Sequence, residues 1–549
     1  MARRHMSLTI KPLIQPPALW LLAGFALFAW SSSQWQFATG IDDAHISFFA
    51  AHTLASAGEI LNYNGERVEQ SSSLLHVLLT ALLSRITQAN TVTCGYLIPL
   101  LSGWLCLPVL WRYTKQEQLG PAVLLCATPA LVYWTYAGLE TALFALLLLW
   151  HIHCLASQKT RWFTLIASGA ALQMTRPELP LFVPVLTLVF SLLCRATGSL
   201  SYAAISRCLL SIAIALCIFA WRKLYFGDLF PQPVVAKTAG ITLTTLKAGV
   251  IYVGQVFTHP ASAVMAACST AATLHPLWRG IRSQESTFVT ASALTCIGYV
   301  LLVVLIGGDW MPNQRFFAPL VPLQALLVTR SLTLLLPTNI ALLAVLTLAV
   351  INCTNNTQLA KIHSPLRDEA PLANQQYSYF ELHSPDNRAN LPTLDALIPW
   401  ISKIQAQKKL PVQILSGQMG LVSYHLSLLF PGQLHFTDRN ALVERSLTVC
   451  SLTHERPRTP QGLEGLATIF FVKKTVVLQQ KCDIAPPDII FDLWWHNKVE
   501  ETPSLMAKYG YTTVHAHTGT TTLFDQLILV RQEWLENSNK IHSEQIAPY

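Results

Sequence analysis

The chain has 549 residues, of which 52% are hydrophobic and only 12% are charged, and its mean hydropathy is +0.40. Average soluble domains carry about 25% charged residues, so this composition excludes an ordinary soluble protein. The net charge of +8 is modest. Its basic residues cluster in short loops, which is typical of a multi-pass membrane protein and not of one that binds nucleic acid. We therefore expect membrane lipids, and no nucleic acid, among its partners.

Hydrophobic runs that approach or reach the length needed to cross a bilayer fill the first 352 residues. The expected spans are 13–30, 71–86, 94–111, 121–136, 139–156, 162–174, 177–194, 203–221, 248–270, 287–306, 315–330 and 331–351. We therefore predict an α-helical polytopic membrane domain over 1–352, with about 11 to 13 transmembrane helices.

Lys and Arg residues in the short loops predict which side of the membrane each loop faces. The loops expected on the cytoplasmic side contain Lys159 and Arg161, Arg195 and Arg207, Arg279 and Arg282, and Arg330. The loops between them, and the C-terminal domain, would then face the periplasm from a bacterial inner membrane. One loop, 111–115, is periplasmic by counting spans and cytoplasmic by its charge. This conflict predicts a missed crossing, or two short helices, between residues 70 and 136.

Residues 353–549 are polar and rich in proline, and they contain no further run of membrane length. We expect them to form a separate soluble periplasmic domain of the α/β class. The predicted strands are 412–415, 476–478, 489–491 and 521–530, and the predicted helices are 394–407 and 441–447. Cys450 and Cys482 lie in this part, where a disulfide is an option if the domain is exported.

Two adjacent carboxylates, Asp42 and Asp43, follow the first span directly. After them, apolar residues recur at spacings of three and four, which predicts a helix lying along the membrane surface; these are Ile41, Ala44, Phe48, Ala51 and Ala55. Aspartate is common at helix starts, so one reading is that the pair only caps this helix. Because one aspartate suffices for a cap, the other reading makes Asp42 and Asp43 catalytic.

Further ionisable residues fall in the loops expected on the same side. They are Glu140, Arg176, Glu178, Arg222, Lys237, Asp309 and Arg315. Each has an ordinary explanation, such as a helix cap, a headgroup anchor or a solvated side chain. Charged side chains near a bilayer are costly, however, at about 2.5–3.5 kcal/mol each at its centre on insertion scales. Their common side therefore predicts a site that binds a donor phosphate and substrate.

Acids and cations at a lipid-facing site suit the transfer of a group from a lipid phosphate to a hydroxyl. An aspartate would take the proton of the attacking hydroxyl, and Arg and Lys would stabilise the charge of the departing phosphate. Attack opposite the leaving phosphate inverts the sugar carbon. The alternatives are a transporter or flippase of lipid-linked sugars, a polysaccharide ligase, and a non-catalytic subunit of an envelope complex. No dedicated metal ligands are visible, so a divalent cation, Mg²⁺ or Mn²⁺, stays open.

These motifs, in order, are DDAHIS, GERVE, GLETALF, TRPE, YFGDLFPQPVVAK and GGDWMPNQRFFAPLVPL. Over residues 40–330 they resemble the GT-C superfamily of polytopic glycosyltransferases, and within it the mycobacterial terminal arabinofuranosyltransferase and its bacterial relatives. Residues 416–424, with Asp438, are similar to the periplasmic domain of those proteins. The resemblance implies a polyprenyl-phosphate sugar donor, a pentofuranose such as arabinofuranose among the candidates, and inverting transfer to a glycan or glycoprotein with Asp42 or Asp43 as base. His45 and Gln70 depart from the family pattern, which expects Tyr and a small residue there.

Overall fold

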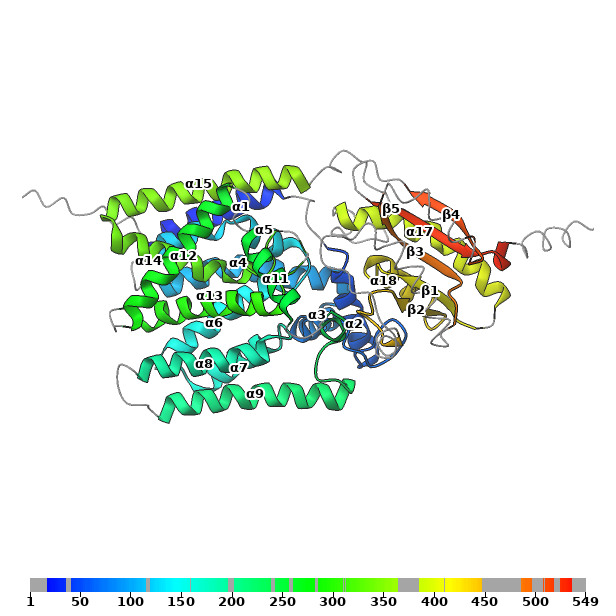
Figure 1. The fold of residues 1–549 in the computed structure, drawn as a ribbon, viewed down its shortest axis with the longest axis horizontal. Coiled ribbons are helices and arrows are strands. Elements are labelled where there is room, and N and C mark those ends of the chain that lie inside the picture. Colours follow the sequence, from blue (N-terminus) through cyan, green and yellow to red (C-terminus); the bar gives the residue numbers. More distant parts are fainter. Residues whose placement is uncertain are drawn as a thin grey trace, which may run out of the picture.

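The computed structural model of the chain describes residues 17–35, 41–114, 119–157, 159–195, 202–237, 242–255, 260–281, 285–309, 311, 313–363, 385–408, 410–446, 485–495, 507, 509–517 and 524–535. Two parts lie end to end, a bundle of helices and a smaller C-terminal part that contains a β-sheet (Figure 1). The candidate site lies where the two parts meet.

The bundle consists of the helices between residues 17 and 363. In chain order they are α1 (Pro17–Gln34), α2 (Ala44–Ala57), α3 (Leu74–Thr87), α4 (Thr91–Thr114), the 3₁₀ helix η2 (Gly120–Cys126), α5 (Pro129–Tyr136), α6 (Thr141–Ala156), α7 (Trp162–Gln173), α8 (Leu179–Arg195), α9 (Tyr202–Phe226), α10 (Gln232–Lys237), α11 (Leu243–Gln255), α12 (Pro260–Ile281), α13 (Thr287–Ile306), the 3₁₀ helix η3 (Ala318–Leu320), α14 (Val321–Leu335) and α15 (Thr338–His363).

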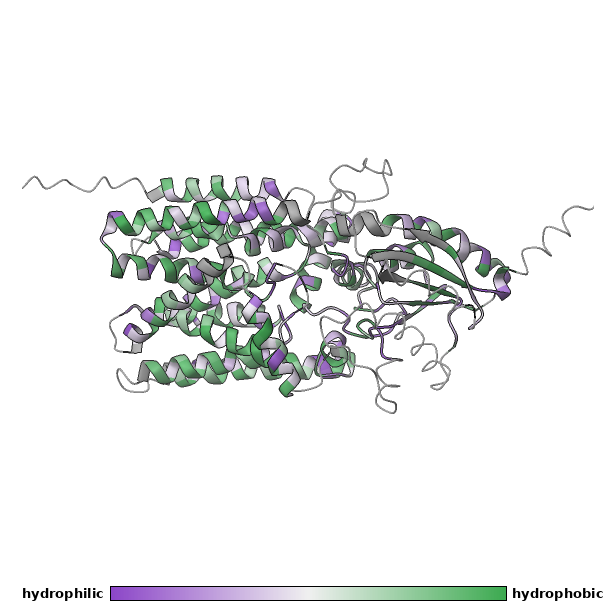
Figure 2. Cartoon of the chain, turned by 45° about the horizontal axis from the view of Figure 1, so that its top comes forward, coloured by the Kyte–Doolittle hydropathy of each residue, from purple (hydrophilic) through white to green (hydrophobic). Residues whose placement is uncertain are grey.

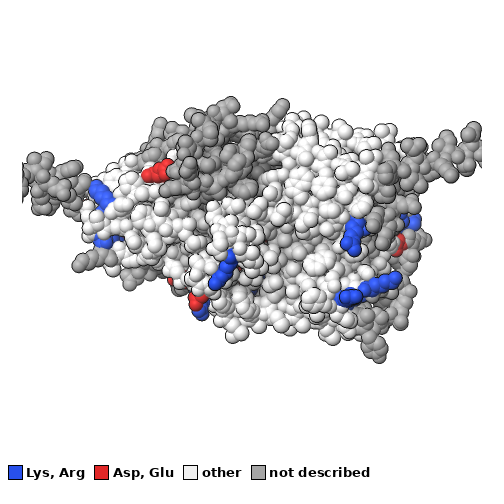
Figure 3. All heavy atoms as spheres, turned by 180° about the vertical axis from the view of Figure 1, so that it is seen from behind, with Lys and Arg blue, Asp and Glu red and all other residues white. Residues whose placement is uncertain are grey.

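Hydrophobic residues cover most of these helices (Figure 2), and the rear face of the molecule carries only scattered charged side chains (Figure 3). Within the described residues, five helices are long and apolar enough to cross a membrane, in α4, α9, α13, α14 with η3, and α15. The pair α5 and α6 makes a sixth span if it is counted as one, although it is bent by 117°. The predicted total of 11 to 13 spans stays a prediction.

The length of helix α3 bears on the conflict over the loop at 111–115. It has 14 residues, which at 1.5 Å per residue give about 21 Å, less than the roughly 30 Å of a bilayer core. Figure 1 shows α2 and α3 together at the end of the bundle that faces the C-terminal part. The helix at the predicted span 71–86 is therefore shorter than a bilayer core, whereas α4 is long enough to cross one. The side of the membrane on which Arg112 lies stays a prediction.

Three other predicted elements differ in detail. The predicted span at 121–136 is divided into η2 and α5, because Pro129 begins a new helix. The predicted span at 248–270 is divided between α11 and α12. Helix α15 continues past the predicted domain boundary at 352 and reaches His363.

The C-terminal part contains α17 (Pro385–Gln407), β1 (Val412–Ser416), α18 (Leu421–Leu429), β2 (Leu434–Asp438), β3 (Ile489–Trp495), β4 (Tyr511–His517) and β5 (Phe524–Arg531). The strand order is β2-β1-β3-β5-β4. Strand β1 runs parallel to both β2 and β3, with Ile414 opposite Phe436 and Ile489, whereas β5 is antiparallel to β3 and β4. Helix α18 therefore connects two neighbouring parallel strands, β1 and β2.

The predicted α/β class of this part is confirmed, with strands at 412–415, 489–491 and most of 521–530 and a helix at 394–407. The prediction missed β2 and β4. It was wrong at 441–445, which form an irregular turn, because the N–H groups of Leu442 and Val443 donate to the Asp438 carboxylate instead of to carbonyl oxygens of a helix. The predicted strand at 476–478, and Cys450 and Cys482, lie outside the described residues.

Candidate functional site

The two aspartates lie in the turn that leads into α2, and their surroundings differ. Asp43 is the N-cap residue of α2, but its side chain makes no capping hydrogen bond. Its exposure is intermediate, whereas Asp42 is only 8% exposed. Asp43 therefore does not cap α2 through its side chain, which argues against the interpretation that the pair only caps its own helix.

Asp42 instead contacts the C-terminal part of the chain. Its Oδ1 accepts a hydrogen bond of 2.8 Å from the backbone N–H of Leu421, the first residue of α18. A carboxylate at a helix N-terminus is favourable because the unpaired N–H groups and the helix dipole are positive there. The residue before Leu421 is Gly420, and a Cβ on it would lie 2.2 Å from Asp42 Oδ2. Only glycine lets α18 approach so closely.

A hydrogen bond connects the aspartate turn to the bend between α5 and α6. The N–H of Ile41 donates to the carbonyl oxygen of Ala137 over 3.1 Å. Gly138 follows with a φ of +79°, and a Cβ there would lie 2.5 Å from the ring of Tyr96. This glycine permits the 117° bend, which brings Glu140 to the same end of the bundle as Asp42.

Glu140 is the centre of a buried ion-pair network. Its Oε1 accepts hydrogen bonds from Arg176 Nη1 at 2.8 Å and from Arg315 Nη2 at 2.9 Å. Arg176 Nε also contacts Glu178 Oε1 at 2.5 Å, and Arg315 Nη1 lies 3.5 Å from Asp309 Oδ2. These side chains are at most 10% exposed. The structure thus brings together five residues that the sequence predicted on one side of the membrane.

Aromatic rings and a tyrosine hydroxyl support this Glu140 network. The guanidinium carbon of Arg176 lies 4.5 Å from the ring centre of Phe316, and that of Arg315 lies 5.6 Å from the ring centre of Trp134. Tyr299 donates to Glu178 over 3.1 Å. Such cation–π contacts stabilise desolvated arginines.

The charges of the Glu140 network limit its chemistry. Three carboxylates and two guanidinium groups leave it with one negative charge, so both arginines are already paired. One donor stays open: the buried Nε of Arg315 has no hydrogen-bond partner among the described residues. The predicted role of Arg176 and Arg315 in binding a donor phosphate stays a prediction, and of the two only Arg315 has a spare N–H.

Arg222 is paired as well. It is fully buried at the end of α9, and its Nε lies 2.9 Å from Glu69 Oε2. Its Nη1 has no hydrogen-bond partner within the described parts of the chain. Burial raises the pKa of the Glu69 carboxyl to about 7 although Arg222 lies beside it. The last residue of α10 is Lys237, and its side chain is outside the described residues, so its predicted role stays untested.

The sequence prediction gave no role to Glu69, and it noted His45 and Gln70 only as departures from the family pattern. Glu69 was visible only as the last letter of the GERVE motif. His45 is fully buried against Tyr424 of α18, with ring centres 5.6 Å apart, and Gln70 Nε2 donates to the carbonyl oxygen of Ile46 over 2.8 Å. Of the two departures from the family pattern, His45 therefore lies in the first turn of α2 and Gln70 bonds to the backbone of that turn.

Amide side chains of the bundle attach the C-terminal part by bonding to its backbone. Asn64 exchanges two hydrogen bonds with the backbone of Phe436, as a neighbouring strand would. Asn62 donates to the carbonyl oxygen of Val443, and Gln232 donates to those of Ala441 and Glu444. The turn residues 62–66 gave no signal for this role in the sequence, because asparagine is common in ordinary loops.

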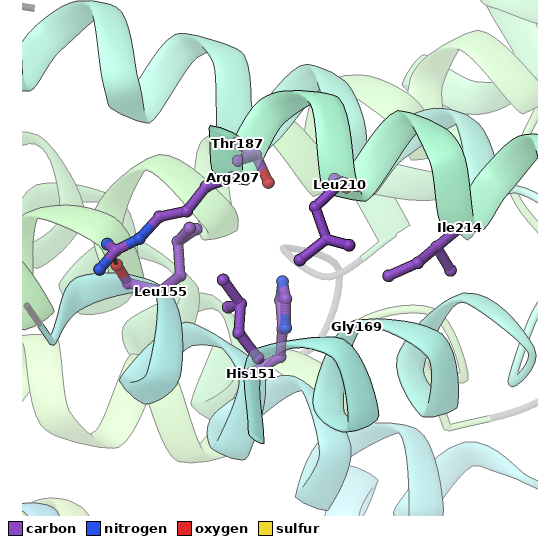
Figure 4. A pocket seen from close by; sticks show the side chains of 9 residues that line it. His151, Leu155, Gly169, Thr187, Arg207, Leu210 and Ile214 are labelled. Carbon is purple, nitrogen blue, oxygen red and sulfur yellow. Dashed lines mark hydrogen bonds between the residues drawn. The ribbon is translucent and has the colours of Figure 1, made fainter. Parts of the chain in front are cut away.

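Two other features do not contribute to the site. Among the described residues, no group of three or more His, Cys, Asp or Glu side chains is arranged to hold a metal ion. Figure 4 shows a pocket between α6, α7, α8 and α9, with His151 and Arg207 among its lining residues. Leu155, which also lines it, is 15 residues from Glu140 along α6, or about 22 Å. That pocket is remote from the aspartates.

No protein-family model matches the chain, and no curated protein sequence matches it. Comparison of folds does find neighbours. The crystal structure of ArnT from Cupriavidus metallidurans bound to undecaprenyl phosphate matches with a TM-score of 0.51 and 11% sequence identity, over 94% of this chain and 98% of that chain. ArnT in the apo state gives a TM-score of 0.50, with the same identity and coverage. The fold is that of ArnT.

The fold shared with ArnT confirms the predicted fold class, a polytopic helical protein with a C-terminal α/β part. The chain is therefore a multi-pass membrane protein. A sequence identity of 11% to ArnT establishes a common fold and no shared substrate. The predicted kinship with arabinofuranosyltransferases, the inner-membrane location and the periplasmic orientation stay predictions.

Two buried carboxylates, Asp438 at the end of β2 and Glu444 in the turn after it, predict that the stability of the C-terminal part depends on pH. Burial raises the pKa of Asp438 from 3.8 to about 6 and that of Glu444 from 4.5 to about 7. The folded chain therefore holds these protons more tightly than the unfolded chain, so their stabilisation is present below about pH 4 and is lost as pH rises through 6 and 7. Glu444 alone would account for about 3 kcal/mol.

Thermal unfolding of the purified protein between pH 4.5 and pH 8 would measure this dependence. The Glu444→Gln variant should flatten it, because a neutral amide replaces the titrating group. Glu533→Gln changes a more exposed carboxylate of the same part and should leave the slope as in the wild type. A wild-type unfolding temperature that rises with pH over this range would contradict the prediction.

Proposed function

We propose that the protein is an inverting glycosyltransferase that moves a sugar from a polyprenyl phosphate to a hydroxyl of an envelope glycan or glycoconjugate. The observation that carries this proposal is the position of the Asp42–Asp43 pair. It lies at the junction of the two parts, one hydrogen bond from the bend that carries Glu140, within a fold shared with ArnT. The structure of ArnT bound to undecaprenyl phosphate supports a polyprenyl-phosphate donor for a protein of this fold.

In the proposed reaction, one carboxylate of the pair takes the proton of the acceptor hydroxyl as its oxygen attacks the anomeric carbon. The bond from that carbon to the phosphate oxygen breaks on the opposite face, and the electron pair leaves with the polyprenyl phosphate. Inversion follows from this geometry. The departing phosphate needs positive charge and no proton, because it is already a good leaving group.

The cations available for that phosphate follow from the pairing already described. Arg222 Nη1 and Arg315 Nε are buried donors without hydrogen-bond partners among the described residues, and buried donors are rarely left unpaired in a functional protein. We assign them, together with Lys237, to the donor phosphate. Arg176, Glu178 and Asp309 would then hold Glu140 and Arg315 in position.

The sugar and the acceptor are proposed on the sequence resemblance alone. Arabinofuranose is the sugar that it favours, and a glycan or a glycoprotein on the periplasmic side of a bacterial inner membrane is the acceptor class. A transporter of lipid-linked sugars is the alternative. The candidate charges gather at one end of the bundle, whereas a transporter is expected to place its binding groups near the membrane midplane, so transfer is the better supported function.

Comparison of envelope glycans from a strain with and without this protein tests the proposal. Mass analysis should show the loss of one sugar residue from one glycan, together with accumulation of the polyprenyl-linked donor. Undecaprenyl phosphate should also raise the unfolding temperature of the purified protein, whereas undecaprenol without phosphate should not. Identical glycans in the two strains would refute the proposal. Movement of lipid-linked sugar across the membrane of vesicles, without transfer of the sugar to an acceptor, would refute it as well.

A further inference from the structure

The pocket shown in Figure 4 lies inside the bundle, and polar side chains from three helices line it. His151 comes from α6, Thr187 from α8 and Ser211 from α9. All three side chains are more than nine-tenths buried. Because buried polar atoms in folded proteins nearly always have a hydrogen-bond partner, the pattern of donors and acceptors in this pocket indicates what it binds.

The contacts of His151 determine which of its ring nitrogens carries the proton. The hydroxyl of Ser168 donates its only proton to the carbonyl oxygen of Leu165 over 3.1 Å. Ser168 therefore accepts from His151 Nδ1, which lies 3.0 Å away, so Nδ1 carries the proton and Nε2 is an acceptor. This Nε2 has no hydrogen-bond partner among the described residues, and Figure 4 shows the ring standing in the pocket.

The other two polar side chains add one acceptor and one donor. Thr187 donates its hydroxyl proton to the carbonyl oxygen of Val183 over 2.8 Å, which leaves its oxygen as an acceptor. Ser211 Oγ accepts from Gln173 Nε2 at 3.4 Å, and its own proton has no acceptor in the described parts of the chain. The three side chains together thus offer two acceptors and one donor.

Two acceptors and one donor are the complement of a water molecule, which donates two hydrogen bonds and accepts others. Buried waters in proteins typically make about three hydrogen bonds. The pocket is narrow, and its inner space is about what one water molecule needs. A ligand hydroxyl would satisfy only one of the two acceptors, an ammonium group would leave the Ser211 proton unpaired, and an anion would face both acceptors.

We infer that this pocket binds one ordered water, which donates to His151 Nε2 and Thr187 Oγ1 and accepts from Ser211 Oγ. The inference does not depend on the proposed function. Helix α9 lies at the margin of the bundle and packs on α7 and α8 (Figure 1), and the water joins it to α6 as well. Because α9 carries Arg222 near its other end, the water helps to hold that residue in place.

A double-mutant cycle tests whether His151 and Ser211 share a partner. His151→Asn keeps a donor for Ser168, because the asparagine amide lies about where Nδ1 does, but it has no atom at the position of Nε2. Ser211→Ala removes the donor. Each change should lower the unfolding temperature of the purified protein by about 2 °C, because buried groups lose a partner. The double variant should be no less stable than the weaker single variant, since either change already loses the water.

His153→Asn is the matched control, because His153 is on the same helix but does not line the pocket. Its ring stacks on that of Tyr113, with ring centres 3.6 Å apart. The shift in unfolding temperature caused by His153→Asn should therefore add to the shift caused by Ser211→Ala.

A cryo-EM map of the full wild-type chain in lipid nanodiscs, at a resolution that shows ordered waters, tests the site without any variant. It should show one water within hydrogen-bond distance of His151 Nε2, Thr187 Oγ1 and Ser211 Oγ. An acyl chain in the pocket, a protein donor bonded to His151 Nε2, or no density beside that nitrogen would overturn the inference. Additive losses of stability for His151→Asn and Ser211→Ala would overturn it as well.

Discussion

Replacing Glu140 with alanine is expected to lower the free energy of unfolding by roughly 3–5 kcal/mol. Glu140 is 1% exposed and is the shared partner of Arg176 and Arg315. Without it, two guanidinium groups remain buried with one negative partner fewer. Leaving a buried charge uncompensated costs far more than the pair itself contributes, because the ion cannot regain its hydration.

Thermal unfolding in detergent would measure this effect. Glu140→Gln keeps an oxygen that accepts the two hydrogen bonds and should fall between alanine and the wild type. Glu59→Gln removes a comparable ion pair with Arg67 on the surface, and it should have no measurable effect because water screens exposed pairs. Equal unfolding temperatures for Glu140→Ala and Glu59→Gln would mean that the Glu140 network does not hold the bundle together.

The Glu69–Arg222 pair should show strong coupling in a double-mutant cycle. Arg222 is fully buried and Glu69 is 4% exposed, so either Glu69→Leu or Arg222→Met alone leaves one buried polar group without its partner. Each single change is expected to cost about 3–5 kcal/mol. The double variant replaces both ends with apolar groups of similar size, so it should recover most of that loss and reach at least the stability of either single variant.

Stabilisation by the donor lipid separates the role of Arg222 in folding from its role in binding phosphate. If Arg222 Nη1 binds the donor phosphate as proposed, the double variant should fold like the wild type yet fail to be stabilised by undecaprenyl phosphate. Wild-type stabilisation by that lipid in the double variant would show that Arg222 serves folding alone. A loss of stability in the double variant equal to the sum of the losses in the two single variants would show that the pair is not formed.

The sequence placed several ionisable residues on one side of the membrane, but in the folded protein they do not all have the role that was predicted. Predicted phosphate-binding cations turn out to be neutralised by carboxylates: Glu140 for Arg176 and Arg315, and Glu69 for Arg222. Grouping by charge detects such a cluster because both partners of an ion pair occur in loops on the same side. It does not distinguish an ion pair whose two partners neutralise each other from charged residues that bind a ligand, since that depends on distances of a few ångströms.

The sequence by itself determined the class of the protein, because hydrophobic run length and loop charge are local properties that a bilayer constrains strongly. It also determined which loops hold ionisable residues and that a helix follows Asp42 and Asp43. The amphipathic character predicted for that helix is wrong in its first half, because residues 44–51 are buried on every side. Only the tertiary structure decided that α3 is too short to cross and that Asp42 binds α18, 379 residues further along the chain. Tertiary contacts such as this one join segments that have no periodic relation in sequence, so no local pattern encodes them. Gly420 is needed for this contact, but a glycine in a loop does not tell which segment it meets.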